Sequence, residues 1–230
     1  MGVAELVRRL SPGSSHFDPE AEAYRRLFER GYRPSALIDV GAYEGHWTRT
    51  ARKVFGTLPT LMIEPQAAKA AMLQRVCQEL PQTRFASHVL AARAGETVTF
   101  FEMETGSSLF PERSDAPRTA VEHRTEQLDA VAPSGDNIFL KIDAQGAELE
   151  ILSGGERTLR GCSLVQLEAA VAHYNEGAPS LSQVLAFMEE RGFAMLDIAG
   201  HSRIQGHLVQ IDLLFVPQGS PLRGDFFSFR

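Results

Sequence analysis

The sequence predicts an α/β fold with a doubly wound, mostly parallel sheet, and three observations support this prediction. The chain has 230 residues, which is enough for one large domain with its own core. Short apolar runs alternate with helical patterns along most of its length, as in repeated βα units. One such unit, LIDVGAYEGHWT at residues 37–48, joins a buried strand to a helix through a glycine turn.

The expected elements follow in order along the chain. The first helix begins after Asp18, an N-cap residue followed by Pro19, and it ends at Gly31. Strands are expected at residues 36–40, 60–64, 84–88, 97–101, 137–142, 163–168, 193–198 and 209–216. Helices are expected at residues 45–55, 65–80, 147–152 and 181–191. No helix separates the last two strands, so residues 199–210 are expected to form a loop that joins an antiparallel pair.

Composition describes an ordinary globular chain, with 43% hydrophobic and 23% charged residues. The 23 basic and 29 acidic residues give a net charge of −6, which argues against a dedicated nucleic-acid binder. Cys77 and Cys162 are expected to be reduced thiols, and no His/Cys cluster indicates a metal site. No apolar run reaches the roughly 18 residues that span a membrane, and no signal-peptide core is present. A cytoplasmic protein is therefore expected.

The glycine turn indicates which kind of ligand the sheet binds. In the dinucleotide pattern G-x-G-x-x-G, the middle glycine lets the backbone approach a pyrophosphate. Here Gly41 and Gly45 are present, but Tyr43 occupies the middle position and leaves no room for a pyrophosphate. A nucleoside ligand without phosphates, such as S-adenosylmethionine (SAM), fits this turn and predicts a methyltransferase. Asp39 is expected to orient the turn or to lie near the amino group of the methionine moiety.

Acidic residues end two of the predicted strands. Glu64 lies 19 residues after Gly45, close to the separation of about 20 at which a carboxylate accepts hydrogen bonds from ribose hydroxyls. Pro65 follows it and begins a helix. Asp143 ends the strand at residues 137–142, so it is expected to contact SAM, to hold the methyl acceptor or to act as a base.

Two further candidates lie at the next strand end. His173 can take a proton from a hydroxyl at working pH, so His173 or Asp143 is the expected base, with Glu168 orienting it. His88 is an additional possibility. The loops at residues 104–118, 172–180 and 199–210 are expected to form the acceptor pocket, and residues 104–118 are either a lid or a disordered loop.

The ordered motifs of the chain resemble the FkbM family of SAM-dependent methyltransferases. They are DVGAYEG (39–45), IEP (63–65), SSL (107–109), LKIDAQGAELEILSGG (140–155), QLE (166–168), YNEGAPS (174–180), ERGF (190–193) and QIDLLFV (210–216). The resemblance implies a single-domain class I, Rossmann-like methyltransferase fold at residues 36–217, with a seven-stranded sheet and an antiparallel C-terminal strand. A helical lead-in at residues 1–35 and a tail at residues 218–230 would flank this domain.

The resemblance also implies residue roles. Gly41, Ala42 and Gly45 would line the turn that binds SAM, and Glu64 would hold the ribose. S-adenosylhomocysteine (SAH) would be the product. The positions implied near the acceptor are Ser107, Ser108 and Tyr174, and the matching acidic positions are Asp143, Glu148 and Glu168. Gln145 stands where the family usually has Glu. The expected acceptor is a hydroxyl of a small molecule such as a secondary metabolite, sugar or glycolipid.

Several alternatives stay open from the sequence. An NAD(P)-linked oxidoreductase would share the strand, turn and acidic residue. A non-catalytic SAM-binding relative is favoured only by Gln145. A divalent-metal-dependent variant would use Asp143 with Glu148 or Glu168. A homodimer is possible, and no partner other than the small-molecule acceptor is expected.

Overall fold

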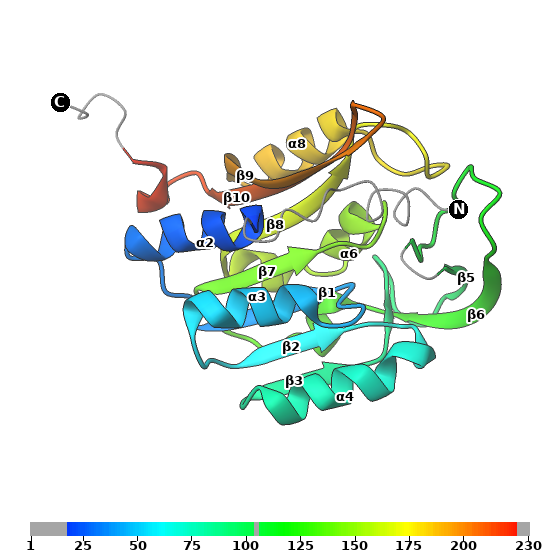
Figure 1. Ribbon diagram of the computed structural model, residues 1–230, viewed down its shortest axis with the longest axis horizontal. Coiled ribbons are helices and arrows are strands. Elements are labelled where there is room, and N and C mark those ends of the chain that lie inside the picture. The colour runs from blue at the N-terminus through cyan, green and yellow to red at the C-terminus, as the bar shows by residue number, and fades with distance from the viewer. Residues whose placement is uncertain (1–17, 104–105, 225–230) are drawn as a thin grey trace.

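The computed structural model describes residues 18–103 and 106–224, and its centre is a seven-stranded sheet of order β3-β2-β1-β7-β8-β10-β9 (Figure 1). All neighbouring strands are parallel except β10, which runs antiparallel to both β8 and β9. The strands are β1 Ala36–Val40, β2 Thr60–Ile63, β3 Thr83–Ala86, β7 Ile138–Ile142, β8 Cys162–Ala170, β9 Phe193–Ile204 and β10 His207–Pro217. The predicted fold class is confirmed.

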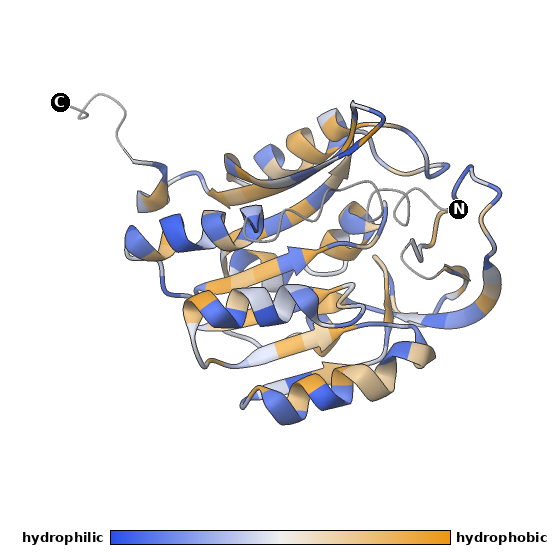
Figure 2. Cartoon of the chain, in the orientation of Figure 1, coloured by the Kyte–Doolittle hydropathy of each residue, from blue (hydrophilic) through white to orange (hydrophobic). Residues whose placement is uncertain are grey.

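Helices cover both faces of this sheet. On one face lie α2 Pro19–Glu29, α3 His46–Phe55 and α4 Ala70–Glu79, with the 3-10 turn η1 Ala67–Lys69 before α4. On the other face lie α5 Leu128–Val131, α6 Glu148–Ser153, α7 Glu156–Arg160 and α8 Leu181–Glu190. A further 3-10 turn, η2 Pro221–Arg223, follows β10. Because both faces are covered, β2 and β7 are buried at every position, and Figure 2 shows the central strands as mainly hydrophobic.

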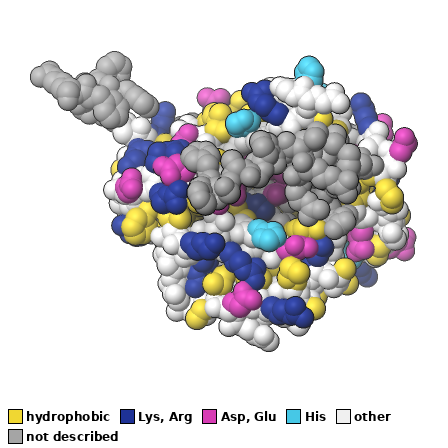
Figure 3. Space-filling model, in the orientation of Figure 1, with side chains coloured by type: hydrophobic (Ala, Val, Ile, Leu, Met, Phe, Trp, Pro, Cys, Tyr) yellow, Lys and Arg dark blue, Asp and Glu magenta, His cyan; other side chains and the backbone are white. Residues whose placement is uncertain are grey.

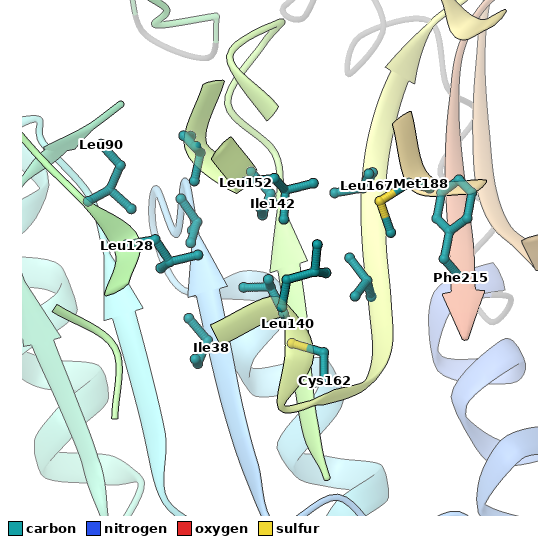
Figure 4. Packing of buried hydrophobic residues seen from close by; sticks show 14 of the residues in the cluster. Ile38, Leu90, Leu128, Leu140, Ile142, Leu152, Cys162, Leu167, Met188 and Phe215 are labelled. Carbon is teal, nitrogen blue, oxygen red and sulfur yellow. The ribbon is translucent and has the colours of Figure 1, made fainter. Parts of the chain in front are cut away.

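The larger core lies between the sheet and α5 to α8. Ile38, Leu140 and Leu167 of the central strands meet Leu152 of α6 and Met188 of α8 in one cluster (Figure 4). The residues of this cluster occupy alternate strand positions, as a pleated strand requires. The opposite positions of the same strands face α2 and α3. There, close to the carboxyl ends of the strands, the apolar packing gives way to charged side chains.

Helix α2 is anchored to the sheet by both packing and hydrogen bonds. Its N-cap is Asp18, whose Oδ1 accepts from Ala21 N at 3.1 Å, as the sequence predicted. Tyr24 is fully buried, and its hydroxyl accepts from Trp47 Nε1 at 2.6 Å and donates to Gln166 Oε1 at 2.5 Å. These bonds join α2, α3 and β8. The rest of the predicted lead-in, residues 1–17, and the end of the predicted tail, residues 225–230, lie outside the described residues.

The fold differs from the prediction in several parts, and the short helices α5 and α7 were not expected. The expected loop at residues 199–210 is wrong, because β9 and β10 extend into it and meet at Gln205 and Gly206, both with positive φ. A second, three-stranded sheet of order β4-β6-β5 contains β4 Val89–Leu90, β5 Thr97–Glu102 and β6 Thr119–Glu126, of which only β5 was expected. No described helix is long and apolar enough to cross a bilayer.

Candidate SAM site

A pocket opens at the carboxyl ends of β1, β2 and β7. Its walls come from the β1–α3 turn, the end of β2 and the segment after β7. Strands β4 and β5 of the second sheet, with the loop that follows β5, complete them. The lining residues are Val40, Gly41, Tyr43, Ile63, Glu64, Pro65, Gln66, His88, Val89, Leu90, Phe100, Ser107, Leu109, Asp143, Ala144, Gln145, Ala147 and Ile151. This is the place where open α/β sheets bind ligands.

The glycine turn brings the ends of β1 and β7 together. Gly41 has φ +73°, and a Cβ atom there would lie 1.8 Å from the carbonyl oxygen of Asp143. No residue with a side chain fits this approach. Gly45, with φ +74°, precedes α3 and packs against Val76 of α4 instead of lining the pocket. Ala42 is buried in the same small cluster with α4. Of the three predicted turn residues, therefore, only Gly41 reaches the pocket wall.

Glu64 is held rigidly at the end of β2. Its Oε2 accepts from Tyr43 N at 2.9 Å and its Oε1 from Gln66 N at 3.0 Å, and the residue is only 3% exposed. Burial raises the pKa of Glu64, although these backbone hydrogen bonds oppose the change. Each carboxylate oxygen keeps a free lone pair, so Glu64 can still accept two hydrogen bonds from a ligand. Pro65 continues the wall beside it.

Asp39 lies below the turn and outside the pocket lining. It is fully buried, and it accepts from Thr48 Oγ1 at 2.7 Å and from Lys141 Nζ at 3.3 Å. Of its two expected roles, this geometry matches the orientation of the turn. Lys141 also lies 3.3 Å from the carbonyl oxygen of Gly41 and 3.5 Å from Asp143 Oδ2. Burial disfavours the charged amine, but the carboxylates of Asp39 and Asp143 outweigh it and raise the pKa of Lys141.

Asp143 is the charged group of this network that the pocket exposes. Its side chain is 36% exposed, and its Oδ1 accepts from Gln145 Nε2 at 3.0 Å. The same Nε2 atom donates to Glu168 Oε2 at 2.8 Å, so Glu168 stands one strand further along, behind Gln145. Burial opposes ionisation of Asp143, but Lys141 and the hydrogen bonds outweigh it and lower its pKa. Burial and the charge of Asp143 raise the pKa of Glu168 well above its usual range.

The turn after β7 is stabilised by residues that do not line the pocket. Glu148 Oε1 accepts from Ala144 N at 2.9 Å and from Gly146 N at 3.1 Å, and burial raises the pKa of Glu148 to about 7. Ser108 is buried and donates to the carbonyl oxygen of Gln145 at 2.8 Å.

Ser107, by contrast, lines the pocket, and its hydroxyl donates to the carbonyl oxygen of Met103 at 2.6 Å.

The remaining predicted residues lie at different distances from the pocket. Tyr174 is buried behind Glu168, donates to its Oε1 at 3.4 Å and accepts from Gln210 Nε2 at 2.6 Å. It lines a small neighbouring cavity rather than the main pocket. His173 is exposed and lines neither cavity, whereas His88 lines the main pocket.

The resemblance singled out Gln145 as the position where the family usually has Glu, but the sequence did not show that this residue contacts both candidate carboxyl groups. The signal that could have found it is its position two residues after Asp143 in a strand-end turn. Its φ of +52° is unusual for a residue with a side chain. The turn therefore aims Gln145 into the site at some conformational cost.

The pocket chemistry fits SAM better than a dinucleotide. Among the described residues, the lining includes two carboxylates, from Glu64 and Asp143, and no Lys or Arg. A pyrophosphate would therefore meet negative charge without a compensating cation. SAM instead carries ribose hydroxyls that Glu64 can bind, a purine that suits the apolar wall of Val89 and Leu90, and a positively charged sulfonium. The expected obstruction by Tyr43 agrees with this, because Tyr43 also lines the pocket.

The family model of the Methyltransferase FkbM domain matches residues 39–195, well over half of the chain. The chain belongs to the FkbM methyltransferase family. It is a SAM-dependent methyltransferase, and SAM is its cofactor. No curated protein sequence matches the chain.

Solved structures agree with the fold of this FkbM methyltransferase. A SAM-dependent methyltransferase from Clostridium acetobutylicum is 7% identical with a TM-score of 0.55, over 94% of this chain and 98% of that one. Magnesium protoporphyrin IX methyltransferase from Synechocystis, solved with SAM, is 11% identical with a TM-score of 0.50, over 86% of this chain and 77% of that one. The 1,6-didemethyltoxoflavin-N1-methyltransferase from Burkholderia thailandensis, solved with SAH, is 9% identical with a TM-score of 0.50, over 93% of this chain and 83% of that one.

Proposed function

We propose that this FkbM methyltransferase transfers the methyl group of SAM to a hydroxyl group of a small molecule, such as a secondary metabolite, a sugar or a glycolipid. One observation carries the proposal. The Asp143 carboxylate is exposed to the pocket while Lys141, 3.5 Å away, stabilises its charge. A hydroxyl must lose its proton during methylation, and Asp143 is an anionic acceptor beside the predicted SAM site.

Each residue has a distinct role in this proposal. Glu64 holds the ribose. Gly41 lets the segment after β7 lie close to the glycine turn. Asp143 accepts the hydroxyl proton. SAM supplies a methyl group that its sulfonium makes electrophilic. Alignment of the acceptor oxygen with that methyl group can contribute roughly 7–11 kcal/mol to lowering the barrier. A positioned base adds a factor of about 10²–10⁴.

Asp143 is a better candidate for the base than His173. His173 is exposed and lies outside the pocket lining. Its predicted role therefore requires a movement of the segment after β8, whereas Asp143 needs none. The His173→Ala variant distinguishes the two candidates, because it should retain turnover if Asp143 is the base.

The first test is transfer of isotopically labelled methyl groups from SAM into fractions of an extract of the source organism. We expect label in a small organic-soluble or sugar-containing fraction, in an ether linkage that resists mild base. Asp143→Asn should lower the transfer by about 10²-fold or more while SAH binding remains. Label in an N-methyl or C-methyl product would contradict the hydroxyl acceptor. Absence of label with SAH binding intact would indicate a non-catalytic relative.

Metal dependence is tested in the same assay. Among the described residues, no group of three or more His, Cys, Asp or Glu side chains is arranged to hold a metal ion. Transfer should therefore persist in EDTA. Loss of transfer in EDTA that Mg²⁺ restores would instead support a metal-dependent reaction.

A further inference from the structure

Gln145 joins the two carboxyl groups at the centre of the site. Its Nε2 atom donates to Asp143 Oδ1 at 3.0 Å and to Glu168 Oε2 at 2.8 Å. The two carboxyl groups follow Ile142 and Leu167, which are partners in the parallel β7–β8 register. We propose that Gln145 is a positioning residue that holds Asp143 and Glu168 as a pair sharing one proton, which resides on Glu168. The inference rests on the proposed role of Asp143 as the base.

The surrounding charges determine which carboxyl group keeps the proton. Lys141 Nζ lies 3.5 Å from Asp143 Oδ2, and in the described part of the chain no basic side chain lies within ion-pair distance of Glu168. Asp212 of β10 is the register partner of Glu168 and disfavours a second negative charge there. Asp143 is therefore the stable anion and Glu168 the stable acid, which agrees with the directions of their pKa changes.

Titratable groups from other elements also face the pair or lie close to it. Glu148 of α6 adds negative potential at Glu168. Tyr174, in the segment after β8, donates to Glu168 Oε1 and is itself kept neutral, because burial raises its pKa well above the usual range. Glu20 of α2 lies on the same face of the sheet and is bonded to Gln166. Lys141 remains the basic partner of this otherwise acidic set among the described residues.

The Gln145 backbone is fixed from two sides. Its carbonyl oxygen accepts from Ser108 Oγ at 2.8 Å and from Asn175 Nδ2 at 2.6 Å, and the residue is 9% exposed. Its Oε1 is buried and has no hydrogen-bond partner among the described residues. A rotated amide would turn Oε1 toward both carboxyl groups and lose both N–H donors. The two carboxyl groups therefore favour the observed orientation of the Gln145 amide.

The paired carboxyl groups define the proton balance of the reaction. As the bond from the methyl carbon to sulfur breaks and the bond to the acceptor oxygen forms, the hydroxyl proton passes to Asp143. SAH and the methylated product leave, and the pair then carries two protons. One proton returns to solvent through the exposed Asp143, which restores the starting state.

Carboxyl titration in the SAH complex tests the inference without any acceptor. We would label Asp and Glu carboxyl carbons with ¹³C and follow them by NMR from pH 4 to 9. We expect one carboxyl signal of the pair to remain protonated at pH 7 and to disappear in Glu168→Gln. Ionisation of both carboxyl groups at pH 7 in the wild type would overturn the inference. This result is independent of whether a hydroxyl acceptor is found.

Variants of Gln145 separate positioning from a purely structural role. Gln145→Met keeps the length of the side chain but removes both N–H donors, so the pKa of Asp143 should rise by about one unit. Asn175→Ser removes only the hydrogen bond from Asn175 Nδ2 to the Gln145 carbonyl oxygen, so it should leave the titration of Asp143 unchanged. Equal titrations in wild type and Gln145→Met would overturn the inference. If Gln145→Met does not fold, Gln145→Asn, which tolerates positive φ, withdraws the amide from both carboxyl groups by one methylene and should also raise the pKa of Asp143.

Discussion

Three acidic residues at neighbouring strand ends have different environments, although the sequence presents them alike. Asp39 is fully buried, with its carboxylate bonded to Thr48 and Lys141. Glu64 is almost as buried, but its hydrogen bonds come from backbone N–H groups and leave lone pairs directed to the pocket. Asp143 alone among the three is substantially exposed. Hydrogen-bond partners therefore separate the structural carboxylate of Asp39 from Glu64, the proposed ribose ligand, and accessibility separates both from Asp143, the candidate base.

At this residue scale, Glu64→Gln tests the ribose role. The amide would turn an N–H group toward a backbone N–H and lose one acceptor for a ribose hydroxyl. We expect the dissociation constant of SAH to rise by about tenfold or more, measured by isothermal titration calorimetry. Glu44→Gln is the matched control, because Glu44 follows Tyr43 in the glycine turn but is bonded to Lys69 and does not line the pocket. Equal losses in both variants would contradict the assignment.

The buried Glu148 predicts a dependence of stability on pH. Its folded-state pKa is about 7 against an ordinary value of 4.5, so the folded state holds this proton more tightly than the unfolded state. The resulting stabilisation is complete below about pH 4.5 and is lost as the pH rises through 7. Glu148→Gln cannot lose a proton. Its free energy of unfolding should therefore gain about 3 kcal/mol relative to wild type between pH 4.5 and 8.

Urea unfolding at several pH values measures this difference. Glu150→Gln is the control, because Glu150 lies in the first turn of the same helix but is exposed. Its stability should follow the wild type across the range. Parallel curves for wild type and Glu148→Gln would show that Glu148 ionises normally.

At the element scale, the contact between β1 and β7 depends on one missing side chain. Gly41→Ala would place Cβ 1.8 Å from the Asp143 carbonyl oxygen and force an L-residue to φ +73°. The strand ends must separate, so we expect loss of SAH binding and a destabilisation of about 3 kcal/mol or more. Gly56→Ala is the matched control, since Gly56 has φ +81° with open space around it. It should cost less, about 1–3 kcal/mol, because its backbone strain comes without a clash.

Thermal unfolding with and without SAH checks both variants. The decisive result is the difference between them, because both introduce a side chain at positive φ. If Gly41→Ala still bound SAH with wild-type affinity, the turn would not need its close approach to β7.

Elements also differ in how they are anchored. Helix α2 contributes Tyr24 to the core and hydrogen bonds to Trp47 and Gln166, so it is packed as part of the sheet layers. The β9–β10 hairpin extends beyond the length that its apolar pattern predicted, because its outer part alternates between exposed and only partly buried positions, where no apolar pattern is needed. Figure 3 shows basic and acidic side chains interspersed over the described surface of one face, as expected for a chain of small net charge.

At the scale of the whole molecule, the pocket joins segments from residue 40 to residue 151, so its ligand should stabilise the entire fold. SAH at about one hundred times its dissociation constant should add about 2.7 kcal/mol to the free energy of unfolding. For a chain of this size, that corresponds to a rise in Tm of roughly 5–10 °C. NADH should have no such effect, because the described residues of the pocket lining include no Lys or Arg to balance its pyrophosphate.

Differential scanning calorimetry with each ligand tests this expectation. Adenosine is a useful further ligand, since it retains the ribose that Glu64 is proposed to hold. Stabilisation by NADH but not by SAH would contradict the assignment of the pocket to SAM and revive an oxidoreductase.

Much of the fold was predictable because local patterns agree with the global arrangement. The apolar runs of β1, β2 and β7 and the glycine turn at Gly41 describe a parallel sheet with a ligand site. Strand β6 was not predictable in the same way. Its sequence TAVEHRTE is polar and half exposed, and it is a strand because β5 and β4 pair with it.

The sequence by itself determined the βα order, the SAM-type turn and the positions of Glu64 and Asp143, because these depend on hydrophobic periodicity and on residues close together in the chain. Only the tertiary structure decided which side chains meet. It buried Asp39, left His173 exposed and placed Gln145 between Asp143 and Glu168. The physical reason is that side-chain contacts across strands depend on register and loop packing, which no local pattern of residues specifies.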